Sequence, residues 1–432
     1  MMTQHTRSLN SNIIFIIGAL GGLLFGFDTG VISGASSLIE SSLRLTITET
    51  SFVTSAVLIG SCIGALGVGG LADRFGRKPL LFMASIFFII GALMSAFAPD
   101  FGIMILARII LGLAVGSASA LTPAYLAELA PTERRGSLQT LFQLMITLGI
   151  LVAYFINIAF LGHNILGWSD WRWMLGTAVI PALALFMGSL ILPESPRYLV
   201  RAGKKELSHK VLIRLRPEYT SEQINSELQD IENADAKAHK GGIKELFTIG
   251  KAPLIAAIGL MFFQQLVGIN SVIYYLPQVF IKGFHLSDSI SIWISVGIGT
   301  VNFLSTILAT KIMDKFPRKK LLIWGALVMG FSLGIITIIN YTVNIETAAI
   351  FTIILIAIYI FGFAVSWGPI CWILIAEMFP LNIRGVGSSF GSAANWIGNF
   401  LVTQFFLSIL VFFHDNIGGP FAIFTVFSFL AI

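Results

Sequence analysis

The sequence predicts an all-α membrane protein with twelve transmembrane helices, and three observations lead to that fold class. Of the 432 residues, 56% are hydrophobic and only 11% are charged, whereas soluble chains carry about 25% charged residues. Apolar runs long enough to cross a bilayer recur along the whole chain. The basic residues collect in alternate connections between these runs, as the positive-inside rule expects.

The predicted helices follow one another from near the N-terminus to the last residue. The first carries an acid and is longer than the apolar region of a signal peptide, so we expect it to remain as a membrane helix. The last run has only 12 residues after Pro420, and we expect the natural chain to continue beyond Ile432. The predicted ranges are 13–34, 52–72, 79–98, 102–127, 137–160, 173–192, 253–281, 290–311, 321–340, 348–376, 386–412 and 421–432.

The distribution of charge predicts orientation and organisation. The N-terminus and every second connection hold all but four of the 27 Lys and Arg residues, so both termini are expected to face the cytoplasm from a cell inner membrane. The basic residues behind the net charge of +5 are therefore explained by membrane orientation, and nucleic-acid binding is not predicted. Between 193 and 251 charged and apolar residues alternate, which is typical of amphipathic helices at the cytoplasmic surface.

This polar segment divides the chain into two halves that repeat each other. Glu128-x-x-Pro131-x-x-x-Arg135-Gly136 recurs as Glu377-x-x-Pro380-x-x-x-Arg384-Gly385, and GGLADRFGRKPL has a counterpart in ATKIMDKFPRKKLL. Two matches in the same order indicate internal duplication. We expect an N-terminal six-helix half over 1–192, a cytoplasmic helical linker over 193–251 and a C-terminal half over 252–432 with an incomplete last helix.

Amide side chains inside the predicted helices are the first candidate site. Gln264 and Gln265 fall near the bilayer midplane, and each amide can both donate and accept, which suits the hydroxyls of a neutral sugar. Interhelical hydrogen bonding, worth about 0.6 kcal/mol on average, is the alternative. Gly368 and Pro369 are expected to break the tenth helix next to Trp372, whose indole can stack on a sugar ring.

Two opposite charges lie inside predicted helices and form the second candidate site. Asp28 in the first helix and Arg108 in the fourth lie at similar distances from the outer ends of their helices, so they can meet. An ionisable residue in a membrane helix is expensive and is a functional hypothesis by default. A purely structural ion pair is the alternative.

Enzyme chemistry is not predicted. The chain has no HExxH, GxSxG or phosphate-loop motif, and its six histidines show no metal-ligand spacing. We therefore expect no catalytic residue, no cofactor and no metal site.

The motifs resemble those of the sugar porter family of the major facilitator superfamily along essentially the whole chain. The matching strings are FGFDTGVISGA, PAYLAELAPTERRG, PESPRYL, QQLVGIN, SWGPICW and EMFPLNIRG, together with Arg108. The resemblance implies a major facilitator fold and binding of a monosaccharide. The substrate-binding role that it implies falls on Gln143, Gln264, Gln265, Asn270, Asn302, Trp372 and Asn395.

The resemblance also implies coupling and gating roles. In the resembling symporters an acid stands where this chain has Asp28, whereas the resembling uniporters have a neutral residue there. Charges at the cytoplasmic ends of the helices lock the two halves together in the resembling family while the site faces outward. The residues that match them are Asp73, Arg77, Glu128, Arg135, Glu377 and Arg384.

These observations predict a secondary active transporter that imports a hexose or pentose with protons by alternating access. Its expected partners are the sugar, protons and the lipid bilayer, and we expect it to function as a monomer. Two alternatives are a facilitative sugar uniporter of the same fold and a transporter-like sugar sensor. A uniporter needs no buried acid, and a sensor would carry a long cytoplasmic tail.

Overall fold

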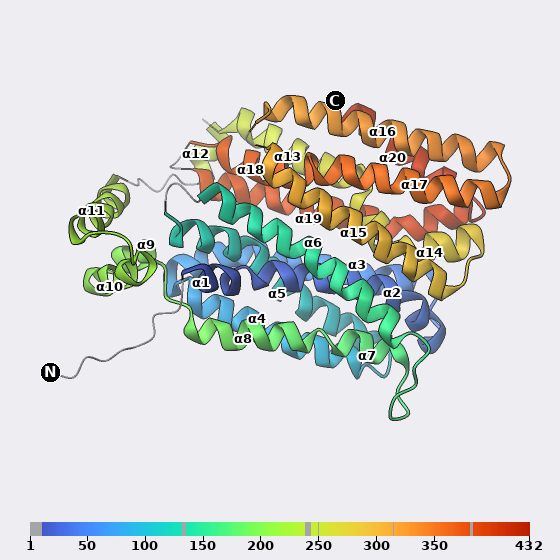
Figure 1. Ribbon diagram of the computed structural model, residues 1–432, viewed down its shortest axis with the longest axis horizontal. Helices are drawn as coiled ribbons and strands as arrows, with labels where there is room; N and C mark the ends of the chain where they lie inside the picture. Colours follow the sequence, from blue (N-terminus) through green and yellow to red (C-terminus); the bar gives the residue numbers. More distant parts are fainter. Residues whose placement is uncertain (1–10, 132–134, 238–242, 249, 314, 381–382) are drawn as a thin grey trace.

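The structure is a computed structural model that describes residues 11–131, 135–237, 243–248, 250–313, 315–380 and 383–432. Long helices lie side by side along one common direction, and short helices extend beyond one end of the bundle (Figure 1). Over the described residues the only β pairing is an isolated bridge between Ile165 and Trp168. The predicted all-α fold class is confirmed.

The first part of the bundle contains α1 to α8. Glycine lets its helices approach closely: a Cβ added at Gly112 would lie 2.0 Å from the carbonyl oxygen of Val57, and one at Gly60 2.2 Å from that of Ile109. Small residues at such crossings are typical of membrane helices. The bounds are α1 Ser11–Gly18, α2 Leu20–Leu43, α3 Ile47–Phe75, α4 Arg77–Ala96, α5 Phe101–Leu129, α6 Arg135–Phe160, α7 Asp170–Gly176 and α8 Val179–Ile191.

Four shorter helices follow where amphipathic helices are predicted. Arg216 is buried beneath them, where it donates to the carbonyl oxygen of Leu129 at 2.8 Å and pairs with Glu227 at 2.9 Å. This pair attaches the segment to the end of α5. We call the end of the bundle beside these helices the linker end, and the opposite end the far end. The bounds are α9 Pro196–Arg201, α10 Lys205–Leu215, α11 Ser221–Lys237 and α12 Ile243–Thr248.

The second part of the bundle contains α13 to α20. It packs against the first part mainly through α19 on α3 and α15 on α6. Figure 1 shows the ribbons of α6 and α15 side by side, although the two helices are far apart in the sequence. The bounds are α13 Lys251–Leu266, α14 Ile269–Phe284, α15 Asp288–Ile312, α16 Arg318–Thr342, α17 Ile345–Ala364, α18 Trp367–Glu377, α19 Arg384–Phe412 and α20 Gly418–Leu430.

Within the described residues, eleven segments are long and apolar enough to cross a membrane, and α20 is a shorter apolar helix. They correspond in order to the twelve predicted runs, but four runs are divided. The first is interrupted at Ala19, and the sixth, seventh and tenth also become two helices each. The first predicted range also ends too early, because α2 continues through the polar run after Gly34 to Leu43.

Candidate functional site

Four of the predicted amides meet in the second part of the bundle. Asn395 on α19 donates to Gln264 Oε1 at 2.6 Å, and Asn270 on α14 donates to Gln265 Oε1 at 2.8 Å. Gln265 Nε2 lies 3.5 Å from Gln264 Oε1 and joins the two pairs. We call Gln264, Gln265, Asn270 and Asn395 the amide cluster; three of them are buried, and Asn270 is half-buried.

The amide cluster lies where two helices are broken. Gly268 separates α13 from α14 with a φ of +89°, in the left-handed region that favours glycine. Gln264 donates to the carbonyl oxygen of Trp367 at 2.8 Å, and Tyr359 donates to that of Val267 at 2.8 Å. A side chain of each broken helix therefore donates to a carbonyl group at the break in the other, as non-helical backbone at membrane depth requires.

Asp28 and Arg108 meet inside the first part of the bundle. Arg108 Nη1 lies 2.5 Å from Asp28 Oδ1, and Nη2 lies 3.2 Å from Oδ2, so the ion pair is bidentate. Arg108 is 0% and Asp28 is 4% exposed. The guanidinium also donates from Nε to the carbonyl oxygen of Val53 at 3.2 Å, so two helices besides its own hold it. Because α2 extends to Leu43, Asp28 lies about 22 Å along the helix from that end, deeper than the apolar run alone predicts.

Hydrogen bonds at the far end join the two parts of the bundle. Ser33 and Tyr154 both donate to the carbonyl oxygen of Ile273, at 3.0 and 3.1 Å. Gln278 donates to Ser36 at 2.7 Å, Lys282 lies 3.4 Å from Glu40, and Ser55 donates to Gln404 at 2.6 Å. We call this set of contacts the far-end seam; it closes the far end between α2, α3 and α6 on one side and α14 and α19 on the other.

Among the described residues, the predicted gate charges at the linker end make no ion pair between the two parts of the bundle, and Asp73 pairs with Arg201 of α9 at 2.8 Å. Arg77 lies 3.0 Å from Glu128 and 3.5 Å from Asp73, all in the first part. Glu377 pairs with Arg318, both in the second part. Arg384 Nε lies 3.4 Å from the carbonyl oxygen of Phe379, and the side chain of Arg135 lies outside the described residues. The predicted lock between the halves thus stays a prediction for another conformation.

Comparison with known proteins decides the family. The family described as "Sugar (and other) transporter" matches residues 14–432. The D-xylose transporter of Levilactobacillus brevis is 47% identical over 410 residues, which are 94% of this chain and 88% of the relative. The glucose transporter GlcP of Staphylococcus epidermidis is 42% identical over 402 residues, or 92% and 87% of the two chains.

This chain belongs to the sugar transporter family. A solved structure of the major facilitator superfamily proton:xylose symporter XylE, bound to 6-bromo-6-deoxy-D-glucose, has a TM-score of 0.85 and 33% identity, and the match covers 98% of this chain and 94% of that one. Transporters of this family are not enzymes, so this chain is a membrane transporter without a catalysed reaction.

Three predicted sugar-binding residues of this sugar transporter lie outside the amide cluster. Gln143 on α6 and Trp372 on α18 are half-buried, and Asn302 on α15 is buried. No hydrogen bond from these three side chains is described, whereas Trp367 in the same helix as Trp372 donates its indole N–H to Leu322 at 2.8 Å. The structure therefore connects four of the seven predicted residues and leaves the roles of the other three as predictions.

Sequence reasoning missed Glu194, which follows α8 in the PESPRYL string. Its carboxylate accepts the backbone N–H groups of Arg77 at 2.9 Å and of Ser195 at 2.8 Å, and it thereby caps the start of α4. Burial raises the pKa of Glu194 above its usual value, although the hydrogen bonds from Ser195, Arg77 and Lys78 oppose that shift. The sequence signal for this role was an acidic residue directly after a predicted membrane helix. Glu194 was not among the predicted gate residues, so the signal was not used.

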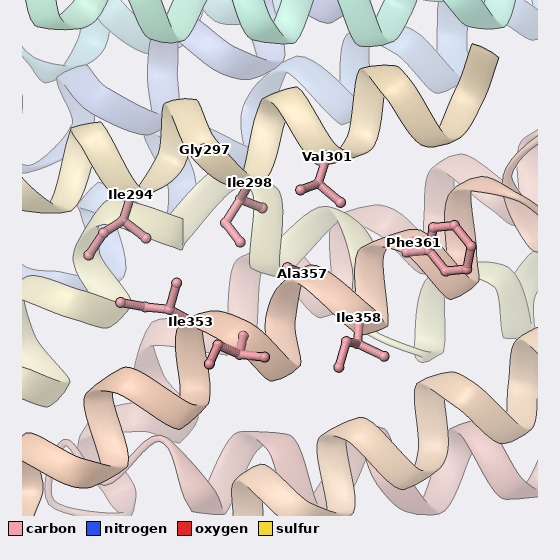
Figure 2. A pocket seen from close by; sticks show the side chains of 9 residues that line it. Ile294, Gly297, Ile298, Val301, Ile353, Ala357, Ile358 and Phe361 are labelled. Atoms are coloured by element: carbon pink, nitrogen blue, oxygen red, sulfur yellow. The ribbon is translucent and has the colours of Figure 1, made fainter. Parts of the chain in front are cut away.

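An apolar groove of about 500 Å³ between α15 and α17 is not part of this site (Figure 2). No polar side chain lines it, so a sugar would find no hydrogen-bond partner there. Ile354 and Phe361 at its edge are exposed, as expected for residues that face lipid. It is lined by Ile294, Gly297, Ile298, Val301, Ile353, Ile354, Ala357, Ile358 and Phe361.

Proposed function

We propose that this chain imports a monosaccharide together with protons by alternating access. The observation that carries the proposal is the separation of two buried sites within one family fold: a full ion pair in the first part and a neutral amide cluster in the second. Relatives described as a D-xylose transporter and a glucose transporter, and the similar proton:xylose symporter, support a pentose or hexose as substrate.

The amide cluster binds the sugar in this proposal. Sugar hydroxyls both donate and accept, as do the side-chain amides of Gln264, Gln265, Asn270 and Asn395. In the structure these amides bond one another, so sugar binding exchanges amide–amide bonds for amide–hydroxyl bonds. Trp372 offers an apolar face to the sugar ring, and Gln143 and Asn302 supply further polar groups.

The Asp28–Arg108 pair carries the proton. The Arg108 guanidinium stabilises the ionised Asp28 carboxylate, while burial away from that guanidinium favours the neutral acid. A movement that separates the two groups therefore favours proton uptake, and a movement that reunites them favours release. Arginine suits this role because it stays charged throughout the cycle.

Alternating access requires the far-end seam and the linker-end charges to act in turn. In the structure the far-end seam is closed, and the described ion pairs of the linker-end charges do not cross between the two parts. When the far end opens, Glu128, Arg135, Glu377 and Arg384 are proposed to pair across the two halves, 1–192 and 252–432, and Asp73 and Arg77 to support them. At each stage the sugar can then reach the amide cluster from only one side of the membrane.

We further propose that the linker end faces the cytoplasm from the cell inner membrane. Most basic residues lie at that end and in the linker over 193–251, as the positive-inside rule expects. Both termini would then be cytoplasmic. The ion pair and the amide cluster both lie within one chain, which supports a functional monomer.

Uptake into proteoliposomes tests the function. Purified protein is expected to accumulate labelled D-xylose or D-glucose above its outside concentration when the outside is acidified, and only to equilibrate it without a pH gradient. Competition by a panel of pentoses and hexoses then identifies the preferred sugar. Equilibration without accumulation under a pH gradient would favour the uniporter, and absence of any sugar flux together with sugar binding would favour the sensor.

A further inference from the structure

Two buried polar groups lie between the amide cluster and the far-end seam without a hydrogen-bond partner. They are Nδ2 of Asn399 on α19 and Oγ of Ser271 on α14. Asn399 is 1% and Ser271 is 0% exposed. A buried donor without an acceptor is unfavourable, and native structures keep few of them. Such a group therefore needs a partner that this conformation of the protein does not supply.

Helix geometry places the two groups at one level. Tyr275 on α14 donates to the carbonyl oxygen of Thr403 on α19 at 3.1 Å, so these two positions face each other. Ser271 and Asn399 each precede one member of this bond by four residues, which is about 6 Å along a helix and on the same face. Both helices run from the amide cluster toward the far end, so both groups lie on the cluster side of the Tyr275–Thr403 bond.

The amide cluster bounds this level from the other side. Asn395 precedes Asn399 by one more turn of α19 and donates to Gln264. Asn270 directly precedes Ser271 and donates to Gln265. A line of polar groups therefore runs along facing helices from the amide cluster, past Ser271 and Asn399, to the Tyr275–Thr403 bond.

Local bonds do not use up these two groups. Asn399 Oδ1 accepts from Thr403 at 3.0 Å, which leaves its NH₂ group free to donate. Ser271 stands in the first turn of α14, and its hydroxyl donates to none of the backbone carbonyl groups that serines in helices commonly use.

We propose that Asn399 and Ser271 form an outer subsite that holds hydroxyl groups of the sugar on its way between the far end and the amide cluster. The inference rests on the proposed sugar transport. When the Tyr275–Thr403 bond opens, the Asn399 NH₂ group donates to a sugar hydroxyl and the Ser271 hydroxyl exchanges hydrogen bonds with it. When the far end closes, the sugar has moved to the amide cluster and both groups are left unpaired.

Kinetics of uptake from the far side test the subsite. Ser271→Ala and Asn399→Leu are expected to raise KM for uptake by about 5- to 50-fold, as loss of a hydrogen bond to a ligand does. Ser271→Ala should not lower the melting temperature, since the closed state loses no bond. Asn340→Ala is the matched control: its amide donates within the second part at 2.9 Å to Ile336, so it should lower the melting temperature and leave KM unchanged.

Two outcomes would overturn the subsite. One is a parental KM for both variants in protein that transports sugar. The other is a lower melting temperature for Ser271→Ala with unchanged KM, which would make the hydroxyl structural. If Asn399→Leu does not fold, Ser271→Ala alone decides between these results. Failure of the parent protein to bind or transport any sugar would instead remove the proposed function, so the two failures are distinguishable.

Discussion

The two buried polar sites of this sugar transporter are built from opposite kinds of chemistry. In the first part a full positive and a full negative charge face each other at 2.5 Å, both almost fully buried. In the second part neutral amides bond one another and the carbonyl groups of two broken helices. In the proposed function the carboxylate of the charged pair binds the proton, and the neutral amides bind the hydroxyl groups of the sugar. The two ligands thus bind in two different regions of the molecule.

The two sites also differ in how easily their hydrogen bonds can be replaced. Removing one partner of a buried ion pair leaves an uncompensated charge, whereas an amide that loses one bond can form another. The far-end seam then couples the regions, because Ser33, on the helix of Asp28, donates to Ile273 on the helix of Asn270. Opening the far end therefore breaks a contact between the two helices that carry these sites.

The largest expected effect comes from breaking the ion pair on one side only. Arg108→Leu leaves Asp28 buried without its partner, and we expect the free energy of unfolding to fall by about 3 to 5 kcal/mol. Thermal unfolding in detergent measures it. The matched control is Lys205→Leu, whose pair with Glu232 is exposed and should contribute at most about 1 kcal/mol. Equal losses in the two variants would contradict the contrast between buried and exposed charge.

A smaller effect is expected in the amide cluster. Gln264→Ala removes the side chain that bonds Asn395, Gln265 and the backbone of Trp367. We expect sugar affinity to fall by about 5- to 150-fold, corresponding to about 1 to 3 kcal/mol, while unfolding changes less than in Arg108→Leu. Calorimetric titration with the transported sugar checks this. An unchanged sugar affinity would show that Gln264 does not contribute to sugar binding.

The far-end seam should respond still less to the loss of one bond. Tyr154→Phe removes one of the two donors to Ile273, and we expect a shift of about 0.5 to 1.5 kcal/mol toward the open far end. Distances between spin labels across the far end report the populations. Tyr359→Phe loses a comparable bond inside the second part and should not shift them. If the open population increased equally in both variants, the far-end seam would not be what keeps the far end closed.

The smallest effect is expected for the partly exposed ion pair of the seam. Glu40→Gln removes the charge opposite Lys282, and each side chain is about a quarter exposed. Such pairs contribute about 0 to 1 kcal/mol and weaken in salt. The same spin-label distances should therefore shift slightly at low ionic strength and return to parental values at high ionic strength. A large shift that persists in high salt would make this pair the dominant contact of the seam.

Hydropathy and charge patterns were sufficient to predict the fold, because a membrane helix must be apolar over about 20 residues whatever its neighbours are. Asp28 and Arg108 could be matched for the same reason, since a buried charge needs a partner. The end of α2 could not be found this way. Ser33, Ser36 and Glu40 are buried or half-buried and contact α14, and sequence patterns do not reveal such tertiary contacts, which favour a helix in a polar stretch.

The helix breaks and the gate were harder to predict for different reasons. The run 253–281 is continuous in hydropathy, and its break at Gly268 depends on a φ of +89° that Tyr359 and the neighbouring helices stabilise. The break of the tenth helix was expected at Gly368 and Pro369 and lies just before them, at Val365 and Ser366. The pairing of Arg77 with Glu128 depends on the conformation, which sequence spacing does not contain.

Proton coupling through Asp28 is the central claim, and a comparison of two transport modes with one variant tests it most directly. Asp28→Asn replaces the carboxylate by an amide of the same shape, which cannot take up and release a proton. In proteoliposomes we expect this variant to exchange labelled sugar for unlabelled sugar at a rate close to the parent's, and to lose accumulation driven by an acidified outside. Accumulation at the parental level would show that the proton uses another group and that the Asp28–Arg108 pair is structural.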